Sequence, residues 1–369
     1  MFDNRTLNIF RISMRIYSSL GSTPYVWDSK QRCISICSTV KRTISFMLAV
    51  TVTAIQLSFL LWRLVQHCQE LEWNRSFEAI IWLWIWIIVT TWTLVSFHNA
   101  WTKKKEVVGL FKGVQLLARY FQKEYPQARM KTFAGNFNSI DVYFLAVMCM
   151  AFAYLMALSL LFYVAPRSSQ YFYSLIDAKI KSNKIFLSFL VLEVYAKTSQ
   201  TFMMATEAFV IIPTLLLAAF GMHYLRRSSH RTIKLSKTIT SFQEIQILIA
   251  YFNHASTPLL LPILSVIVPS AVCVMSSFAA IRFYNFLAFF QYVPFPNMLI
   301  NEVVIISITL IPATAIYESS NNHQRIILRL HIGEQVDGKI GKMLRKRLTA
   351  LRTFGVRVEP ICKETVIRQ

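Results

Sequence analysis

Residues 79–102, AIIWLWIWIIVTTWTLVSFHNAWT, form a run of 24 residues without an acidic or basic side chain other than one histidine. The hydrocarbon core of a bilayer is about 30 Å thick, and a helix rises about 1.5 Å per residue. About 20 apolar residues are therefore enough to cross it. This stretch predicts a membrane-spanning helix. Other uncharged runs of about this length are therefore candidate spans as well.

Five further runs of similar character predict an all-α polytopic membrane protein with six transmembrane helices. The run 245–281 has 37 uncharged residues, too many for one span, so its membrane part is placed at 257–280. The predicted spans are 43–62, 79–102, 142–166, 198–225, 257–280 and 297–317. They form a transmembrane domain over 43–318, between an N-terminal tail (1–42) and a basic C-terminal tail (319–369).

The overall composition supports this interpretation. Hydrophobic residues make up 55% of the 369 residues and charged residues 15%, with a mean hydropathy of +0.45. A soluble domain carries about 25% charged residues, so this chain lacks the polar surface that a soluble protein needs. The formal charge of +21 would suggest nucleic acid on a soluble protein, but here it indicates basic loops beside a lipid bilayer. No nucleic-acid partner is expected.

The distribution of lysine and arginine predicts the orientation. The tails and the second and fourth loops carry 31 of these residues, whereas the first, third and fifth loops carry 7. Basic residues are retained on the cytoplasmic side, so both termini are expected inside. The sequon at Asn74 then lies outside and is a candidate glycosylation site. A G-protein-coupled receptor is disfavoured, because its N-terminus lies outside and neither D-R-Y nor N-P-x-x-Y occurs here.

Two of the inner segments predict helices that project from the membrane. Residues 106–121 and 233–252 carry apolar side chains at helical spacing. Helices lying flat on the inner leaflet would show the same pattern. Gly109 and Gly113 match a motif that packs membrane spans together, but they lie in a loop between spans, so the match is taken as chance.

Two acids within the spans are candidate ligand-binding residues, because an ionisable group in the bilayer is costly and often functional. Glu207 is ten residues from the predicted outer end of span four, and Glu302 is about two turns into span six. Both are expected in the outer half at similar depth. The alternative is that each carboxyl group is protonated or hydrogen-bonded to a neighbouring helix.

Aromatic residues near the outer ends of spans two and three add two more candidates, Trp86 and Tyr163. Such rings could line a pocket for an apolar or cationic small molecule. An interfacial aromatic belt is the commoner explanation for such residues.

An enzyme is not expected. The seven histidines form no metal-ligand spacing with one another, and neither Gly-x-Ser-x-Gly nor a phosphate-binding loop is present. The six cysteines contain no C-x-x-C pair. The sequence therefore predicts no metal site and no cofactor.

Several short strings resemble the arthropod odorant and gustatory receptor superfamily. Residues 241–248, SFQEIQIL, followed by Asn253, are similar to the segment that precedes span five in divergent members. Residues 292–296 and 313–320 are similar to the two ends of the family's span six, and residues 351–358, LRTFGVRV, to the stretch before its span seven. The resemblance covers most of the chain in layout and about forty residues in sequence.

The resemblance implies a ligand-gated cation channel of the plasma membrane that detects a small odorant or tastant. It implies a homo- or hetero-tetramer of related subunits, an outer-half ligand pocket, cytoplasmic helices that form a central anchor, and a seventh span that lines the pore. This sequence stops at Gln369, where that span is expected to begin, so a truncation before the pore helix is also expected. The alternative is a six-span transporter or accessory membrane subunit.

Overall fold

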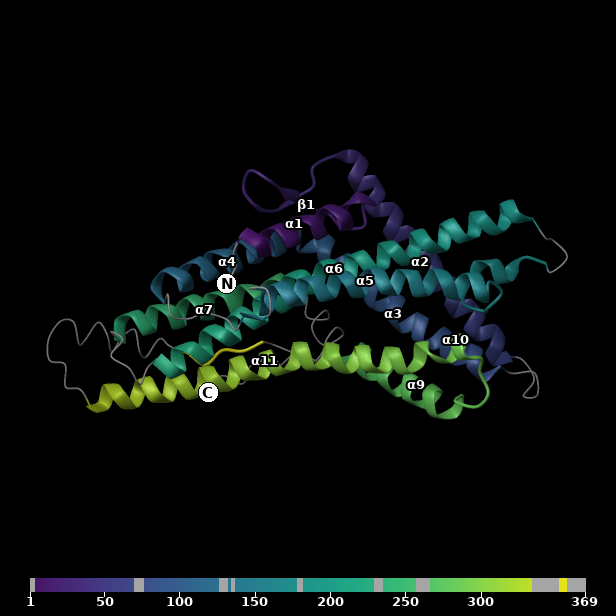
Figure 1. Ribbon diagram of the computed structural model, residues 1–369. Coiled ribbons are helices and arrows are strands. Elements are labelled where there is room, and N and C mark those ends of the chain that lie inside the picture. Colours follow the sequence, from purple (N-terminus) through teal and green to yellow (C-terminus); the bar gives the residue numbers. More distant parts are fainter. Residues whose placement is uncertain are drawn as a thin grey trace, which may run out of the picture.

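The computed structural model describes residues 4–69, 76–125, 132–133, 137–177, 182–228, 235–256, 266–333 and 352–356. These residues are almost entirely helical, as predicted (Figure 1). The helices are α1 (Asn4–Ser19), α2 (Val40–Gln69), α3 (Phe77–Thr102), α4 (Lys104–Glu124), α5 (Ser139–Val164), α6 (Asn183–Ser228), α7 (Leu235–Ala255), α9 (Val268–Arg282), α10 (Phe289–Tyr292) and α11 (Pro294–Gly333). The strands are β1 (Tyr25–Asp28), β2 (Cys33–Ile36), β3 (Thr132–Phe133) and β4 (Phe137–Asn138).

Five of these helices are long and apolar enough to cross a membrane: α2, α3, α5, α6 and α11. Each contains most or all of one predicted span. The shorter apolar helix α9 occupies the described part of the predicted span 257–280, whose residues 257–265 lie outside the described part of the chain. The multi-pass helical architecture predicted from the uncharged runs is therefore confirmed.

Helix α6 is the centre of the bundle. It packs against α5, α7, α11 and α3, and most of its apolar side chains are buried. Helices α5 and α11 instead leave many large apolar side chains exposed, among them Met156 and Ile311. In water such a surface would be unfavourable, but lipid tails cover it without cost. Figure 1 shows α5 running beside part of the much longer helix α6.

The N-terminal segment is folded onto the bundle. Phe10 of α1 stacks on Phe111 of α4 with ring centroids 4.4 Å apart, and it also contacts Phe144 and Phe209. Strands β1 and β2 pair antiparallel in the register Tyr25↔Ile36. This hairpin was not predicted, because each strand is only four residues long and carries little alternation to mark it.

Helices α4 and α7 form a second packed layer beyond the ends of the spans. Gly109 and Gly113 lie at this contact: a Cβ added to Gly109 would come 2.3 Å from Tyr251 Oη, and one added to Gly113 would come 3.3 Å from Leu248. These two glycines, whose spacing was not assigned a role in the sequence analysis, permit the close approach of α4 to α7.

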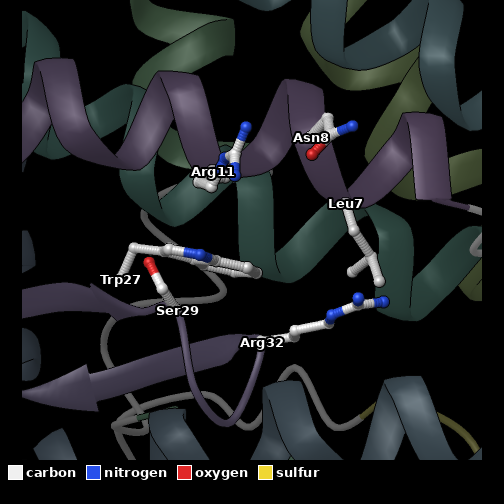
Figure 2. Close-up of a pocket in the computed structure, with 6 residues that line it drawn as sticks. All are labelled: Leu7, Asn8, Arg11, Trp27, Ser29 and Arg32. Carbon is white, nitrogen blue, oxygen red and sulfur yellow. The ribbon is translucent and has the colours of Figure 1, made fainter.

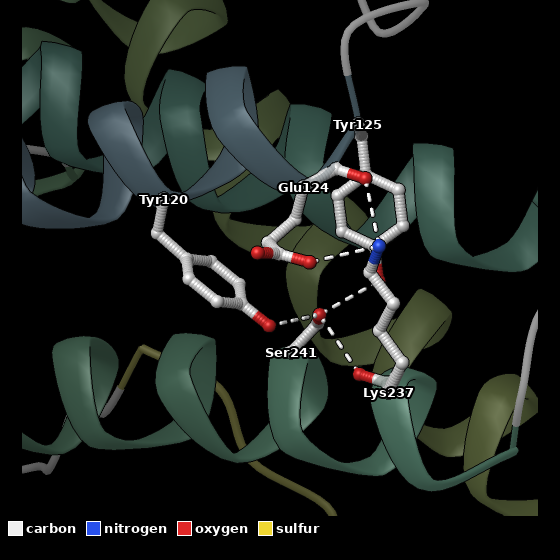
Figure 3. Close-up of polar contacts among 5 residues, drawn as sticks. All are labelled: Tyr120, Glu124, Tyr125, Lys237 and Ser241. Carbon is white, nitrogen blue, oxygen red and sulfur yellow. Dashed lines mark hydrogen bonds and ion pairs between the residues drawn. The ribbon is translucent and has the colours of Figure 1, made fainter.

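A hydrogen-bonded cluster stabilises the same contact (Figure 3). The hydroxyl of Ser241 lies 2.7 Å from Tyr125 Oη and 3.0 Å from Tyr120 Oη, and it donates to the carbonyl of Lys237. The ammonium group of Lys237 lies 2.8 Å from the carboxylate of Glu124.

Candidate functional site

A cation lies on an aromatic ring inside the bundle. Nζ of Lys197, on α6, lies 3.4 Å from the ring centroid of Trp86, on α3. Trp86 is 1% exposed and Lys197 is 6% exposed. A cation over the face of tryptophan is stabilised by the ring quadrupole, and the gain is largest when water is excluded.

One helical turn before Lys197, Glu193 supplies the opposite charge. It is also buried, and its Oε1 accepts a hydrogen bond of 3.1 Å from the backbone N–H of Phe172. Residues i and i+4 share a helix face, so Glu193 and Lys197 face the same interior and interact electrostatically. Sequence reasoning missed both, because their charges were counted as part of the loop before residue 198. The i, i+4 spacing of opposite charges was the available signal.

A pair of amides continues this polar interior. Gln200 donates a hydrogen bond of 2.7 Å from Nε2 to Oε1 of Gln56, on α2. We refer to Gln56, Trp86, Glu193, Lys197 and Gln200 as the Trp86 cluster. It joins α2, α3 and α6 at the end of the bundle where α3 begins.

Glu302 lies at the same end of the molecule, on α11. Seven residues before it, Phe295 contacts Trp82 with ring centroids 4.6 Å apart. Glu302 is 6% exposed and interacts electrostatically with Tyr154 on α5 and Cys273 on α9. An acid from α11 is therefore buried among side chains of three helices.

Unpartnered polar atoms concentrate in this part of the molecule. Buried polar groups normally have hydrogen-bond partners. An interior with several unpaired polar atoms therefore suits a water molecule or a polar ligand group. Among the described residues, buried side-chain atoms here without a partner are Gln56 Nε2, Trp86 Nε1, Thr90 Oγ1, Glu193 Oε2, Ser199 Oγ, Ser276 Oγ and Glu302 Oε2.

Glu207 lies elsewhere. It accepts a hydrogen bond of 2.5 Å from the hydroxyl of Ser96, which is six residues from the end of α3. Glu207 is ten residues beyond Lys197 on the same helix, a separation of about 15 Å along the axis. The expectation that Glu207 and Glu302 share one depth in the outer half is therefore wrong. The reason is the length of α6, which begins at Asn183 and not near Thr198.

The two remaining candidates do not join the Trp86 cluster. Tyr163, in the last turn of α5, is 68% exposed and its ring contacts Phe186 edge-on at 6.3 Å. Asn74 lies outside the described residues. Within the described ranges, no three His, Cys, Asp or Glu side chains are placed to hold a metal ion.

Comparison with known proteins gives a match in structure. No protein-family profile and no curated protein sequence matches the chain. Among solved structures, the insect olfactory receptor OR5 from Machilis hrabei in complex with eugenol aligns with a TM-score of 0.54 and 13% identity, covering 94% of this chain and 87% of that one. The same receptor described without eugenol gives a TM-score of 0.51 at 13% identity, covering 96% and 92%.

The chain has the insect olfactory receptor fold.

Within this fold, three of the strings that resemble the receptor superfamily meet in space. Asn253 Nδ2 donates a hydrogen bond of 3.0 Å to the carbonyl of Gly355, and the hydroxyl of Ser320 bonds both the carbonyl and the N–H of Phe354. The ring of Phe354 packs edge-on against Phe242, with centroids 5.0 Å apart. Residues 352–356 thus fasten α7 to α11, which gives these otherwise loose sequence similarities a shared structural role.

Proposed function

We propose that this protein is a subunit of a chemosensory receptor, a ligand-gated cation channel of the plasma membrane that detects a small odorant or tastant. The observation that carries the proposal is the insect olfactory receptor fold over 94% of the chain. The solved receptor with this fold is described in complex with eugenol, a small molecule. Both termini are proposed to be cytoplasmic, and the receptor is proposed to be a homo- or hetero-tetramer.

The ligand is proposed to bind beside Trp86 and Glu302. Both side chains are buried, and each carries a polar atom, Trp86 Nε1 or Glu302 Oε2, that has no partner among the residues described by the structure. Besides the charged and amide groups of the Trp86 cluster, apolar side chains surround Trp86, among them Trp82, Leu158 and Phe295. A mostly apolar molecule with a hydroxyl or carbonyl group matches this environment. Its binding would open the gate by stabilising the open state over the closed one.

Ligand-evoked current tests the proposal. The chain would be produced in cells alone and together with a related receptor subunit, and eugenol and a panel of small volatile compounds would be applied. We expect an inward cation current from one of the two combinations. Uptake of a radiolabelled compound without current would instead favour the transporter, and neither response would favour an accessory subunit.

Two substitutions test the site. Trp86→Leu and Glu302→Gln should each raise the ligand concentration for half-maximal current by about tenfold, since each removes a contact of about 1–2 kcal/mol. Leu116→Ala, at an exposed position on α4, is the control. Unchanged ligand sensitivity in both variants would contradict the site and leave the channel function intact.

A further inference from the structure

A cavity of about 380 Å³ lies between α1 and the β1–β2 hairpin, far along the bundle from the Trp86 cluster. Figure 2 shows Trp27 extending from the hairpin beneath α1, with Arg11 and Asn8 above it and Arg32 at the far end. The lining residues are Leu7, Asn8, Arg11, Trp27, Ser29 and Arg32. This described lining contains two guanidinium groups and no carboxylate.

Arg11 lines this cavity and is half-buried. Its Nε is enclosed by protein, and within the part of the chain that the structure describes it has no hydrogen-bond partner. Leaving an N–H of a charged group unpaired is costly. A guanidinium presents its donors in a planar fork that matches a phosphate, so a turn of the Arg11 side chain would pair an unused donor with a bound anion.

Arg32 is held at the cavity by a strained backbone. Its φ is +51°, in the left-handed region that non-glycine residues rarely adopt. Two contacts fix this conformation: Gln115 Nε2 donates to the carbonyl of Arg32 at 3.0 Å, and the carboxylate of Asp28 accepts from the backbone N–H groups of Lys30 and Gln31. Such strain persists where the surrounding structure imposes it, and functional sites are common examples.

The cavity also lies near the ends of two predicted spans. Thr6, one residue from the lining, donates to Asp141 in the first turn of α5, and Phe10 stacks on Phe111 just after the α3–α4 junction. The cavity is therefore level with the ends of the spans, on the side where lysine and arginine concentrate. At this level a lipid headgroup and a soluble anion can both reach it.

We propose that this cavity binds a phosphate group, with Arg11 and Arg32 as its ligands. The phosphate is carried either by an anionic lipid headgroup or by a small soluble phosphate ester. The ring of Trp27 provides an apolar wall for the glycerol part of such a molecule. This site is separate from the proposed ligand site and does not depend on channel function.

Binding to the purified full chain in a neutral detergent tests the proposal. The probes are phosphatidic acid, glycerol phosphate and inorganic phosphate, with bound species counted by native mass spectrometry. The variants are Arg11→Gln and Arg32→Gly. Glycine adopts a φ of +51° without strain, so the second variant removes the guanidinium and preserves the turn. Lys30→Gln and Arg5→Gln each remove one charge from the same segment outside the lining and serve as matched controls.

We expect each lining variant to weaken binding by about tenfold or more, and each control to change it by less than about twofold. Binding of phosphatidic acid alone would identify a lipid headgroup as the source, and binding of glycerol phosphate as well would show that a soluble ester is sufficient. Absence of binding by all three probes would overturn the proposal. Equal weakening by controls and lining variants would also overturn it, because the attraction would then be diffuse.

Discussion

A single hydrogen bond holds the buried acid Glu207. Ser96→Ala would leave this carboxyl group without its donor in an interior that water does not reach. We expect a loss of about 1–3 kcal/mol in the free energy of unfolding, measured as a lower thermal unfolding temperature in detergent.

Glu207→Gln provides the comparison, because a glutamine oxygen can still accept from Ser96. Its thermal unfolding temperature should be close to that of the parent protein, and its sensitivity to ligand should be unchanged. A strong loss of ligand sensitivity in Glu207→Gln would return Glu207 to the list of ligand contacts.

The buried pair Glu193 and Lys197 gives a second prediction. Lys197→Met keeps the apolar stem over Trp86 but leaves Glu193 buried without its counter-charge, so we expect a loss of about 3 kcal/mol or more. Adding Glu193→Gln should restore much of the stability. A double-mutant cycle on thermal unfolding measures the coupling, and additive effects of the two substitutions would contradict it.

At this scale, sequence identified the residues that stand out against an apolar background. Glu302 and Trp86 became candidates because an acid or an aromatic cluster inside an uncharged run is conspicuous, and both stay proposed ligand contacts. Lys197 and Glu193 were not, because counting spans between charges places every charge outside a span. The cost of burying these charges is offset by contacts that are distant in sequence. Lys197 lies on Trp86, 111 residues away, and Glu193 accepts a hydrogen bond from the backbone of Phe172, 21 residues away.

Helix α4 meets α7 through Gly109, and this contact can be tested. Gly109→Ala would place a Cβ 2.3 Å from Tyr251 Oη, so the ring or the helix must move. We expect a net destabilisation of about 1 kcal/mol, because the higher helix propensity of alanine offsets part of the overpacking cost. Tyr251→Phe removes the closest atom and should recover part of the loss. If Gly109→Ala unfolds like the parent protein, the helices are not in close contact.

The hydrogen-bonded cluster in Figure 3 separates two kinds of stabilisation between these helices. Ser241→Ala removes the partner of both tyrosine hydroxyl groups, and Ser241 is fully buried, so we expect a loss of about 1–3 kcal/mol. Lys237→Gln removes the ion pair with Glu124, the hydrogen bond from Nζ to the Glu124 carbonyl and the contact of Nζ with the Tyr125 ring. The side chains of this ion pair are about one-third exposed, so we expect a smaller effect than for Ser241→Ala.

The effect of Lys237→Gln should also depend on pH. The hydrogen bond from Lys237 lowers the pKa of Glu124, and the same bond raises the pKa of Lys237. The stabilisation from Glu124 is complete above its ordinary pKa and is lost as the pH falls through the lowered value. The difference in thermal unfolding between parent and variant should therefore shrink in acid, where only the hydrogen bond to the Glu124 carbonyl and the contact with the Tyr125 ring remain. A difference of the same size at neutral and acidic pH would contradict this origin.

At the scale of helices, periodicity was informative where a helix has one apolar face. The predicted segments 106–121 and 233–252 correspond to α4 and α7. Periodicity could not find the hairpin at residues 25–36, nor the extension of α6 before residue 198. The hairpin is held by a tertiary contact, the hydrogen bond from Tyr25 Oη to the carbonyl of Ala100, and the extension by the buried charge pair.

For the molecule as a whole, the orientation in the membrane can be tested with two cysteines at opposite ends of α2. Cys37 lies three residues before this helix and Cys68 lies in its last turn. In chains that keep one of them and carry serine at the other cysteines, a membrane-impermeant maleimide should label Cys68 in intact cells. Cys37 should be labelled only after permeabilisation. The reverse pattern would contradict the cytoplasmic N-terminus.

The global architecture was the most predictable level, because the bilayer limits a chain to spans of fixed length. Lateral arrangement was not predictable in the same way. Which apolar face meets α6 and which meets lipid depends on packing, and a uniformly apolar helix such as α5 carries no marked stripe to decide it.

The length of α6 gives the receptor fold a mechanical property. Its 46 residues extend about 69 Å, more than twice the thickness of the hydrocarbon core. Pro213 lies within it and cannot donate the backbone hydrogen bond of its turn, so α6 can bend most easily at this point. The part of α6 from Asn183 to Pro213 is about 45 Å long. A bend of about 10° at Pro213 would therefore move its first residue by about 8 Å. A small rotation of α6 near the Trp86 cluster would thus be accompanied by a displacement of several ångström at the far end of the helix.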